Sequence, residues 1–204
     1  MPILKMKDKI IAFTVDIDWA PEEAIADTLQ LFAKYGVPAT LFCTHDSDVL
    51  KNADRSLFEL ALHPDFNCLL LNATGESRTA KDIVEQLHDM YPEAVGIRSH
   101  SMTQNSYLLN LFAEKGYLYD ANSFWPYDFD LKPKTMWNGL HRVPYNWEDD
   151  IHFECGHTYA DLRIDLENGS YFVFDFHPCH IALNTNDKNY YADNKEAFYR
   201  GPTP

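Results

Sequence analysis

The side chains best suited to chemistry in this chain are acids, histidines and one arginine that follow short apolar segments. Asp16 and Asp18 follow the first of these segments, residues 10–13. Two carboxylates at the end of a buried strand repel each other and lose hydration, and a bound cation removes that cost. The alternative is that both acids only cap a following helix, because Asp is common before helices and Pro21 suits a first helical turn. The comparable positions after later apolar segments hold His63, Arg98, His100 and His177.

Taken together, these side chains suffice for metal-assisted hydrolysis of an amide or an ester. One carboxylate and two neutral imidazoles bind a zinc-like ion and leave a position open for water. A second carboxylate can take a proton from that water, and an arginine beside the carboxylate keeps it ionised. A further histidine can protonate the leaving group.

Each of these histidines also has a purely structural interpretation. His63 precedes Pro64 and His100 lies between two serines, so either side chain can simply close a turn. Of His177 and His180, at least one is expected in the site. Three further histidines are expected to be structural or exposed, namely His88 on a predicted helix and His152 and His157 in the aromatic loop region.

Residues 144–150 combine a proline with aromatic and acidic side chains. Tyr145 and Trp147, together with the acids at 148–150, suit the face and the hydroxyls of a sugar ring. The alternative for Trp147 is core packing, which is the usual role of a large aromatic side chain.

The segments that carry these residues alternate between strand and helix patterns. Strands are predicted at 10–13, 39–43, 59–62, 94–97, 117–119 and 171–176, and helices at 22–35, 54–58, 81–90 and 106–115. Residues 121–160 are predicted to form long loops over a site, and the tail after Asn184 is predicted to be a loosely attached end.

This alternation predicts right-handed crossovers and a mostly parallel sheet, with the polar residues at the carboxyl ends of its strands. That edge is where sites are built in α/β barrels and open α/β sheets. In 204 residues, about seven strands fit a distorted, incomplete (β/α) barrel better than a complete eight-stranded one. We expect one domain over residues 1–204.

Composition limits the compartment and the partners. The formal net charge of −14 argues against nucleic acid and anionic membranes as partners. No apolar run has the length of a membrane span, and the first nine residues lack a secretory signal pattern. The four cysteines form no C-x-x-C pair, so we expect reduced thiols in a cytoplasmic protein and no cysteine–zinc site.

Over residues 10–180 the chain resembles the polysaccharide deacetylase family, also called the NodB-homology or carbohydrate esterase family 4 group. Residues 14–18 match the D-x-D form of the first family motif. This match implies Asp16 as the general base and Asp18 as a metal ligand.

The second motif is matched only in its first half. Residues 59–63 fit it and imply His63 as a ligand, but the second histidine of the motif is replaced by Asn67, and amides are poor ligands for zinc. Three outcomes remain open. His100 takes the place of the missing ligand, Asn67 fills that place weakly, or the metal site is lost.

The remaining motifs are matched to different degrees. Arg98 keeps the arginine of the third motif without its proline, and residues 147–150 match the fourth motif loosely. Residues 172–177 match the fifth motif, an apolar strand that ends in a catalytic histidine, here His177. The departures indicate a divergent branch associated with sugar modification in surface polysaccharide synthesis.

The resemblance implies a metal-dependent hydrolase that removes an N-acetyl group from an amino sugar, in lipopolysaccharide synthesis, with zinc as the expected divalent ion. The substrate would be a nucleotide-, lipid- or polymer-linked acetamido sugar. The alternatives are an esterase or cyclic-amide hydrolase on the same scaffold, or a metal-free carbohydrate-binding relic. The implied site has Asp16, Arg98 and His177 as catalytic residues, Asp18, His63 and His100 as metal ligands, and Tyr145, Trp147 and His180 as sugar contacts.

Overall fold

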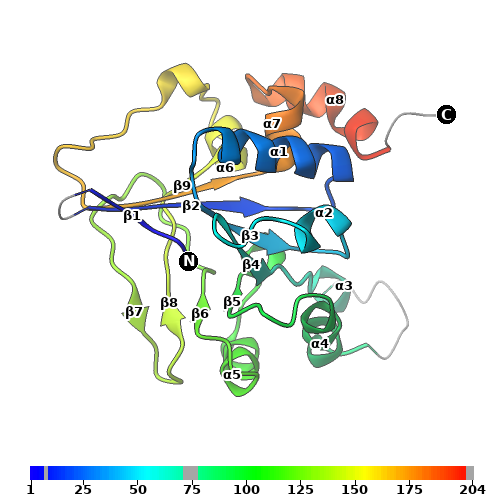
Figure 1. Cartoon of the computed structure of the whole chain (residues 1–204). Helices are drawn as coiled ribbons and strands as arrows, with labels where there is room; N and C mark the ends of the chain where they lie inside the picture. Colours follow the sequence, from blue (N-terminus) through cyan, green and yellow to red (C-terminus); the bar gives the residue numbers. More distant parts are fainter. Residues whose placement is uncertain (7–8, 71–77, 201–204) are drawn as a thin grey trace.

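A curled sheet forms the centre of the computed structural model, and helices pack around it (Figure 1). The structure describes residues 1–6, 9–70 and 78–200. Within those residues the sheet has ten strands in the order β7-β8-β6-β5-β4-β3-β2-β10-β9, with β1 paired to β2. The strands are β1 (Leu4–Met6), β2 (Lys9–Asp16), β3 (Ala39–Cys43), β4 (Phe58–Leu62), β5 (Gly96–Ile97), β6 (Tyr119–Asp120), β7 (Lys134–Thr135), β8 (His141–Arg142), β9 (Trp147–Glu148) and β10 (Tyr171–Phe176).

The sheet is an open barrel and it is mostly parallel. Only the β1–β2 and β7–β8 pairs are antiparallel among the strand pairs of the described ranges. The edge strands β7 and β9 are not neighbours in the strand order, so the barrel does not close over the described residues. The predicted incomplete (β/α) barrel is therefore confirmed. It has more strands than expected because β7, β8 and β9 lie in the segment predicted to be loops and because β1 precedes the first predicted strand.

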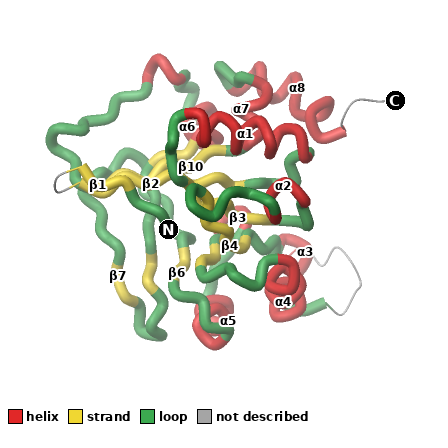
Figure 2. The backbone as a smooth tube through the Cα atoms, viewed as in Figure 1, coloured by secondary structure: helices red, strands yellow, loops and turns green. Residues whose placement is uncertain are grey.

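The helices connect the strands and cover the sheet (Figure 2). No helix in the described part of the chain is both long and apolar enough to cross a membrane. The α-helices are α1 (Glu22–Lys34), α2 (Asp48–Lys51), α3 (Asn67–Leu70), α4 (Ala80–Met90), α5 (Ser106–Glu114), α6 (Asp149–Glu154), α7 (Pro178–Leu183) and α8 (Lys188–Arg200), and the 3-10 helices are η1 (His100–Met102) and η2 (Tyr159–Asp161).

The first long helix, α1, begins without help from the two acids that precede it. Its N-cap residue is Pro21, and no side chain caps the helix. Asp16 and Asp18 therefore do not act as helix caps, and the capping interpretation of the acid pair is wrong. The helix ends before Gly36, whose φ of +62° is a conformation that glycine adopts without strain.

Two predicted local structures are wrong. Residues 54–58 do not form a helix, because Asp54 accepts a hydrogen bond from the Ser56 N–H in a turn and Phe58 already belongs to β4. The helix of this region is α2, which begins earlier because the Ser47 side chain caps it. The tail after Asn184 contains the helix α8, and the Tyr191 ring lies 4.4 Å from the His180 ring of α7.

The register between β2 and β10 determines which side chains reach the site. The Phe13 ring contacts Phe32 of α1, with ring centroids 6.2 Å apart, so this face of β2 is turned toward the helix. Because side chains alternate along a strand, Thr14 and Asp16 lie on the opposite face. Asp175 of β10 is paired in register with Thr14, which places it on that same face.

Candidate active site

A cavity of about 130 Å³ lies at the carboxyl edge of the parallel strands. It receives side chains from the ends of β2, β4, β5 and β10 and from the loops that follow them. Of the sequence-predicted site residues, the ones that line it are Asp16, Asp18, His63, Arg98, His100, Tyr145 and His177. The other lining residues are Ser99, Ser101, Met102, Glu148 and Asp150.

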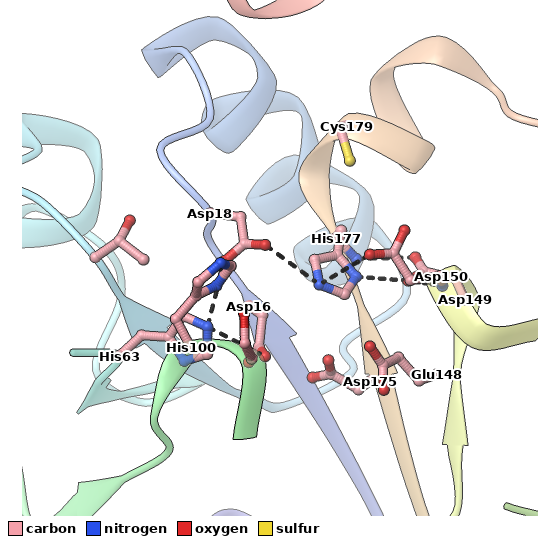
Figure 3. A network of polar contacts seen from close by, with 12 residues as sticks. Asp16, Asp18, His63, His100, Glu148, Asp149, Asp150, Asp175, His177 and Cys179 are labelled. Carbon is pink, nitrogen blue, oxygen red and sulfur yellow. Dashed lines mark hydrogen bonds and ion pairs between the residues drawn. The ribbon is translucent and has the colours of Figure 1, made fainter. Parts of the chain in front are cut away.

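Asp18, His63 and His100 come together on one side of the cavity (Figure 3). Asp18 Oδ1 lies 3.2 Å from His63 Nε2 and 3.1 Å from His100 Nδ1. One potential ligand atom from each residue lies within 4.8 Å of the others. One carboxylate oxygen and two imidazole nitrogens are a donor set that zinc accepts.

Three connections in the backbone bring this cluster together. Asp18 occupies a tight turn in which the Ala20 N–H donates to the Ile17 carbonyl over 2.9 Å. His63 follows β4 directly and its N–H donates to the Cys43 carbonyl of β3. The His100 N–H donates to the carbonyl of Pro64, so the loop after β5 is held against the loop after β4.

The tautomer of His63 fits a role as a metal ligand. Its Nδ1 lies 2.8 Å from the backbone carbonyl of Arg98. A carbonyl only accepts hydrogen bonds, so Nδ1 carries the proton and Nε2 is left facing the two carboxylates of Asp16 and Asp18. Burial would lower the pKa of His63, but the charges of Asp16 and Asp18 and a hydrogen bond to Asp18 raise it, which favours a proton on Nε2 when no cation is bound. A cation that displaces this proton would lie between the nitrogen lone pair and the two carboxylates, as in sites where a second partner orients the ligating histidine.

Burial by itself would raise the pKa of the Asp18 carboxyl group. Hydrogen bonds from His100 and His63, and the nearby charges of His63 and His177, outweigh that effect and hold the pKa well below its usual range. Asp18 is therefore an ionised group over the physiological pH range, which is the state that a metal ligand needs.

Asn67 does not take part in this cluster. Its amide donates to the Ser101 hydroxyl over 3.3 Å, and its side chain does not line the cavity. Among the three outcomes left open by the sequence, the geometry favours His100 in the place of the missing histidine.

Arg98 is almost completely buried in the wall of the site, with 1% of its surface exposed. The guanidinium lies 4.2 Å from the ring centroids of Phe42 and of Tyr145, so it is sandwiched between them. Its Nη1 donates to Asp16 over 2.7 Å and to Asp175 over 2.5 Å. Arg98 thus holds the Asp16 carboxylate at the cavity wall, and its positive charge compensates the negative charge of that carboxylate.

Asp175 shares the guanidinium with Asp16 and also accepts a hydrogen bond from the Thr14 hydroxyl. Burial raises the pKa of Asp175 to about 6, against the lowering effect of the Arg98 charge. Two carboxylates beside one guanidinium leave one negative charge in excess, which makes this inner position favourable for an added proton or cation.

His177 lies on the other side of the cavity and is held by a carboxylate. Its Nδ1 lies 2.7 Å from Asp149 Oδ1, and its backbone N–H donates to Asp149 Oδ2 over 2.9 Å. The Nε2 atom points toward Asp18 Oδ2 at 3.7 Å (Figure 3). Burial would lower the pKa of His177, but the Asp149 charge and hydrogen bond, with help from Asp150 and Asp175, raise it well above its ordinary value.

His180 does not reach the cavity, and it supports Asp150 instead. Its Nε2 lies 2.5 Å from Asp150 Oδ1, and its Nδ1 lies 3.1 Å from the Thr185 hydroxyl. Only 1% of His180 is exposed, and Asp150 stands between it and the cavity. We therefore replace the predicted sugar contact at His180 with a supporting role toward Asp150.

Of the two predicted aromatic sugar contacts, the structure separates Tyr145 from Trp147. Tyr145 lines the cavity and its hydroxyl donates to Glu148 over 3.2 Å. Trp147 is 1% exposed, does not line the cavity, and packs 5.2 Å from Phe176 in the core. Successive side chains on a strand point to opposite faces, and Glu148, the neighbour of Trp147 on β9, points into the cavity. The Trp147 side chain therefore points away from it.

Glu148 is the first acid of the run at 148–150 that the sequence predicts to suit the hydroxyls of a sugar, and it lines the cavity. Burial raises the pKa of its carboxyl group to about 8, with further raising by Asp175 and Asp16 against the lowering effect of His177. The carboxyl group is therefore protonated for the most part at neutral pH and can donate a hydrogen bond into the cavity.

Three other acids have contacts that sequence reasoning missed, namely Asp149, Asp150 and Asp175. The first two were read as sugar contacts within the acidic run at 148–150, but they hold His177 and His180. The sequence did contain a signal for these contacts, because two acids and two histidines occur in matching order. Asp149 pairs with His177, and Asp150 pairs with His180. For Asp175, the signal was a charged residue inside an apolar strand.

The open α/β barrel, with acids and histidines gathered at the carboxyl edge of its strands, has the architecture of the NodB-like polysaccharide deacetylases. A Mycobacterium smegmatis protein of known crystal structure, assigned as a polysaccharide deacetylase, has a TM-score of 0.53 and 18% identity, over 87% of this chain and 80% of that chain. At this identity the likeness concerns the fold alone.

The match to a particular family is more specific. Residues 13–195 match the WbmS-like polysaccharide deacetylase family, and the chain belongs to it. A Bordetella bronchiseptica protein of known structure, assigned as a polysaccharide deacetylase involved in O-antigen biosynthesis, has a TM-score of 0.85 and 37% identity, over 93% of this chain and 79% of that chain. No curated protein matches the chain. The predicted family and fold class are confirmed.

Proposed function

We propose that this protein is a metal-dependent hydrolase that removes an N-acetyl group from an amino sugar used in a bacterial surface polysaccharide. The observation that carries the proposal is the arrangement within one cavity of three groups. They are the Asp18–His63–His100 cluster, the Arg98-held carboxylate of Asp16, and the Asp149-held imidazole of His177.

Asp18, His63 and His100 would hold the ion, and one carboxylate with two imidazoles favours zinc. When bound, a divalent ion there would polarise the acetyl carbonyl and lower the pKa of the attacking water. Support for this donor set comes from the orientation of His63, whose Nδ1–H is committed to the Arg98 carbonyl while Nε2 faces the carboxylates.

The residues of the chain would move two protons. Asp16 accepts a proton from water as the water oxygen bonds to the carbonyl carbon, and the hydrogen bond from Arg98 holds this carboxylate in place. His177 donates the Nε2 proton to the amide nitrogen as the carbon–nitrogen bond breaks. Acetate and a free amino sugar are the products, and the Asp149 carboxylate stabilises the protonated imidazole between turnovers.

The sugar would be held by the other side chains of the cavity. Tyr145 and Glu148 are hydrogen-bonded to each other and line the cavity beside Arg98. The protonated carboxyl of Glu148 can donate to a sugar hydroxyl or to the acyl oxygen. The O-antigen role assigned to the Bordetella relative supports an acetamido sugar of a surface polysaccharide, or its nucleotide- or lipid-linked precursor, as the substrate.

The test combines metal analysis with an assay for released acetate. We expect the purified protein to hold about one divalent ion per chain, and we expect His63→Ala to lose most of that metal and all deacetylation of N-acetylated amino sugars. His157→Ala is the matched control, because His157 is exposed and does not line the cavity, and it should behave as the unmodified protein.

Full metal occupancy in His63→Ala would remove His63 from the ligand set. Release of acetate from O-acetylated sugars alone would favour the esterase alternative. A protein that binds sugars, binds no metal and turns over none of these substrates would be the carbohydrate-binding relic.

A further inference from the structure

A second cavity of about 350 Å³ adjoins the one that holds the acid and histidine cluster. The two share a wall. Trp19 lines the second cavity and follows Asp18 in the chain, and its ring meets His100 of the first cavity edge-to-face, with centroids 5.1 Å apart. Asp65, which lies two residues after His63, also lines the second cavity. A molecule with its reacting end at Asp18 can therefore extend past Trp19.

Trp19 has a conformation that packing does not explain. Its φ of +54° lies in the left-handed region, which is strained for a bulky side chain, and Asp18 before it has a φ of +44°. The turn is held because the Trp19 N–H donates to the Thr44 hydroxyl over 3.0 Å. Yet 42% of Trp19 is exposed, so the strained backbone presents a large aromatic face to solvent at the cavity rather than to the core.

The second cavity combines an apolar floor with polar groups at its rim. Ile83, Leu87 and Met90 of α4 form the apolar part. The polar lining consists of groups that bond hydroxyls as donors or acceptors, and they are His45, Asp46, Asp65, Arg78 and Gln86.

The charges of this lining favour a neutral ligand. The lining holds the carboxylates of Asp46 and Asp65 and the guanidinium of Arg78, and Asp46 is paired with Lys51 outside the lining. Burial lowers the pKa of His45, so its imidazole adds no positive charge at neutral pH. The lining therefore has no excess of positive charge for a phosphate or another anion, whereas a ring with hydroxyl groups would meet donors, acceptors and an aromatic face.

We propose that this second cavity is a saccharide subsite in which Trp19 stacks on the sugar next to the one whose N-acetyl group is removed. The proposal rests on the proposed function for the identity of the reacting sugar. It adds that the enzyme recognises at least two linked sugar rings and that Trp19 selects for the second of them.

The test is a binding measurement on metal-free protein, with N-acetylglucosamine and its β1,4-linked disaccharide, N,N′-diacetylchitobiose, as probes. By calorimetry we expect the unmodified protein to bind the disaccharide more tightly than the monosaccharide. Trp19→Gly should lower the disaccharide affinity about tenfold, because the apolar face of the second ring loses its cover, and should leave the monosaccharide affinity unchanged. Trp19→Phe should restore most of the difference.

The matched control is Trp137→Gly, since Trp137 is 67% exposed and lines neither cavity. Thermal unfolding separates a binding role from a structural one, because glycine adopts a positive φ without strain and Trp19→Gly should keep or raise the melting temperature. Equal affinity of the unmodified protein for the two probes would overturn the subsite. An unchanged disaccharide affinity in Trp19→Gly would overturn the role of Trp19.

Because these measurements need neither metal nor turnover, they separate the two proposals. Trp19-dependent binding without acetate release would leave the subsite standing and remove the deacetylase function. If the protein deacetylates its substrate equally well without Trp19 and shows no preference for the disaccharide, the deacetylase function would stand and the subsite would be removed.

Discussion

The two sides of the cavity each present a histidine, and the partner of the second ring nitrogen differs between them. His63 donates its Nδ1 proton to a neutral backbone carbonyl, that of Arg98. His177 donates its Nδ1 proton to a carboxylate, that of Asp149, and this carboxylate is completely buried. The two imidazoles are similarly enclosed, with 2% and 4% of their surfaces exposed, so the difference lies in the partner and not in the degree of burial.

This difference shows how one site can use the same residue type for two tasks. A carbonyl fixes the tautomer of His63 without adding a charge, which suits an imidazole that must offer a lone pair. A carboxylate at the same atom stabilises the protonated form, which suits an imidazole that must give a proton away. The experiments below break or sharpen this contrast, in order of the expected effect.

The largest effect is expected on the metal side of the cavity, where His100→Ala should lose most of the bound metal and all turnover. The reason is that His100 Nδ1 lies 3.1 Å from Asp18 Oδ1 and belongs to the same donor cluster as His63, whereas the second histidine of the family motif is replaced by Asn67. Asn67→Ala is the matched variant and should keep its metal, because the amide bonds Ser101 instead. Elemental analysis of both variants decides, and metal loss in Asn67→Ala with retention in His100→Ala would reverse the assignment.

Asp16→Asn should retain the metal and lose detectable turnover. Asp16 lies 3.5 Å from His63, but its nearer contact is Arg98, so we place it with the groups that move protons. An amide of the same size cannot accept the proton of water. Asp27→Asn, at an exposed position of α1, is the control and should keep full activity. If Asp16→Asn also loses its metal, Asp16 belongs to the ligand set.

His177→Ala should reduce turnover of an N-acetyl sugar by about a hundredfold to ten-thousandfold while the metal stays bound. The loss should be smaller on an activated ester such as p-nitrophenyl acetate, because its leaving group departs without a proton. Measuring kcat on both substrates tests the assignment. Equal losses on the amide and the ester would show that His177 is not the general acid.

The smallest effect concerns stability rather than activity, and it involves Glu148. Its carboxyl group is surrounded by Asp16, Asp149, Asp175 and His177, and burial raises its pKa to about 8 from an ordinary value of 4.5. The folded state therefore keeps a proton that the unfolded chain releases above about pH 4.5. The resulting stabilisation is full below that pH and is lost as the pH rises through about 8.

Glu148→Gln removes this titration, so it provides the comparison. The melting temperature of the metal-free unmodified protein should fall, relative to that of Glu148→Gln, as the pH rises from about 5 to about 8. A difference between the two proteins that does not change over this range would show that Glu148 is ionised in the fold.

The elements that could be predicted lie in long periodic segments or in apolar runs, and the runs include the two-residue strands β5 and β6, which fall at the ends of the strands predicted at 94–97 and 117–119. The helix predicted at 22–35 is α1, and the strand predicted at 39–43 is β3 with the same bounds. The strands β7, β8 and β9 are also two residues long, but none of them lies in an apolar run, and two residues show neither alternation nor helical spacing. They exist because the neighbouring strands offer backbone partners, which is a property of the assembled sheet.

The sequence alone determined the candidates for chemistry and the edge at which they meet. Asp16, His63, Arg98 and His177 each follow an apolar strand, and parallel strands present their carboxyl ends on one side of the sheet. Residue type and position along the strand suffice for that inference, because both the alternation of side chains and the direction of the crossovers are local rules.

Only the tertiary structure decided which groups touch. Asp149 meets His177 across 28 residues, Arg98 reaches Asp175 across 77, and Asn67 bonds Ser101 while His100 faces Asp18. The same is true of Trp147, which turns into the core while its neighbour Glu148 turns into the cavity. These choices depend on register and on the curl of the sheet, which set distances between segments that are far apart in the chain and leave no pattern within any one of them.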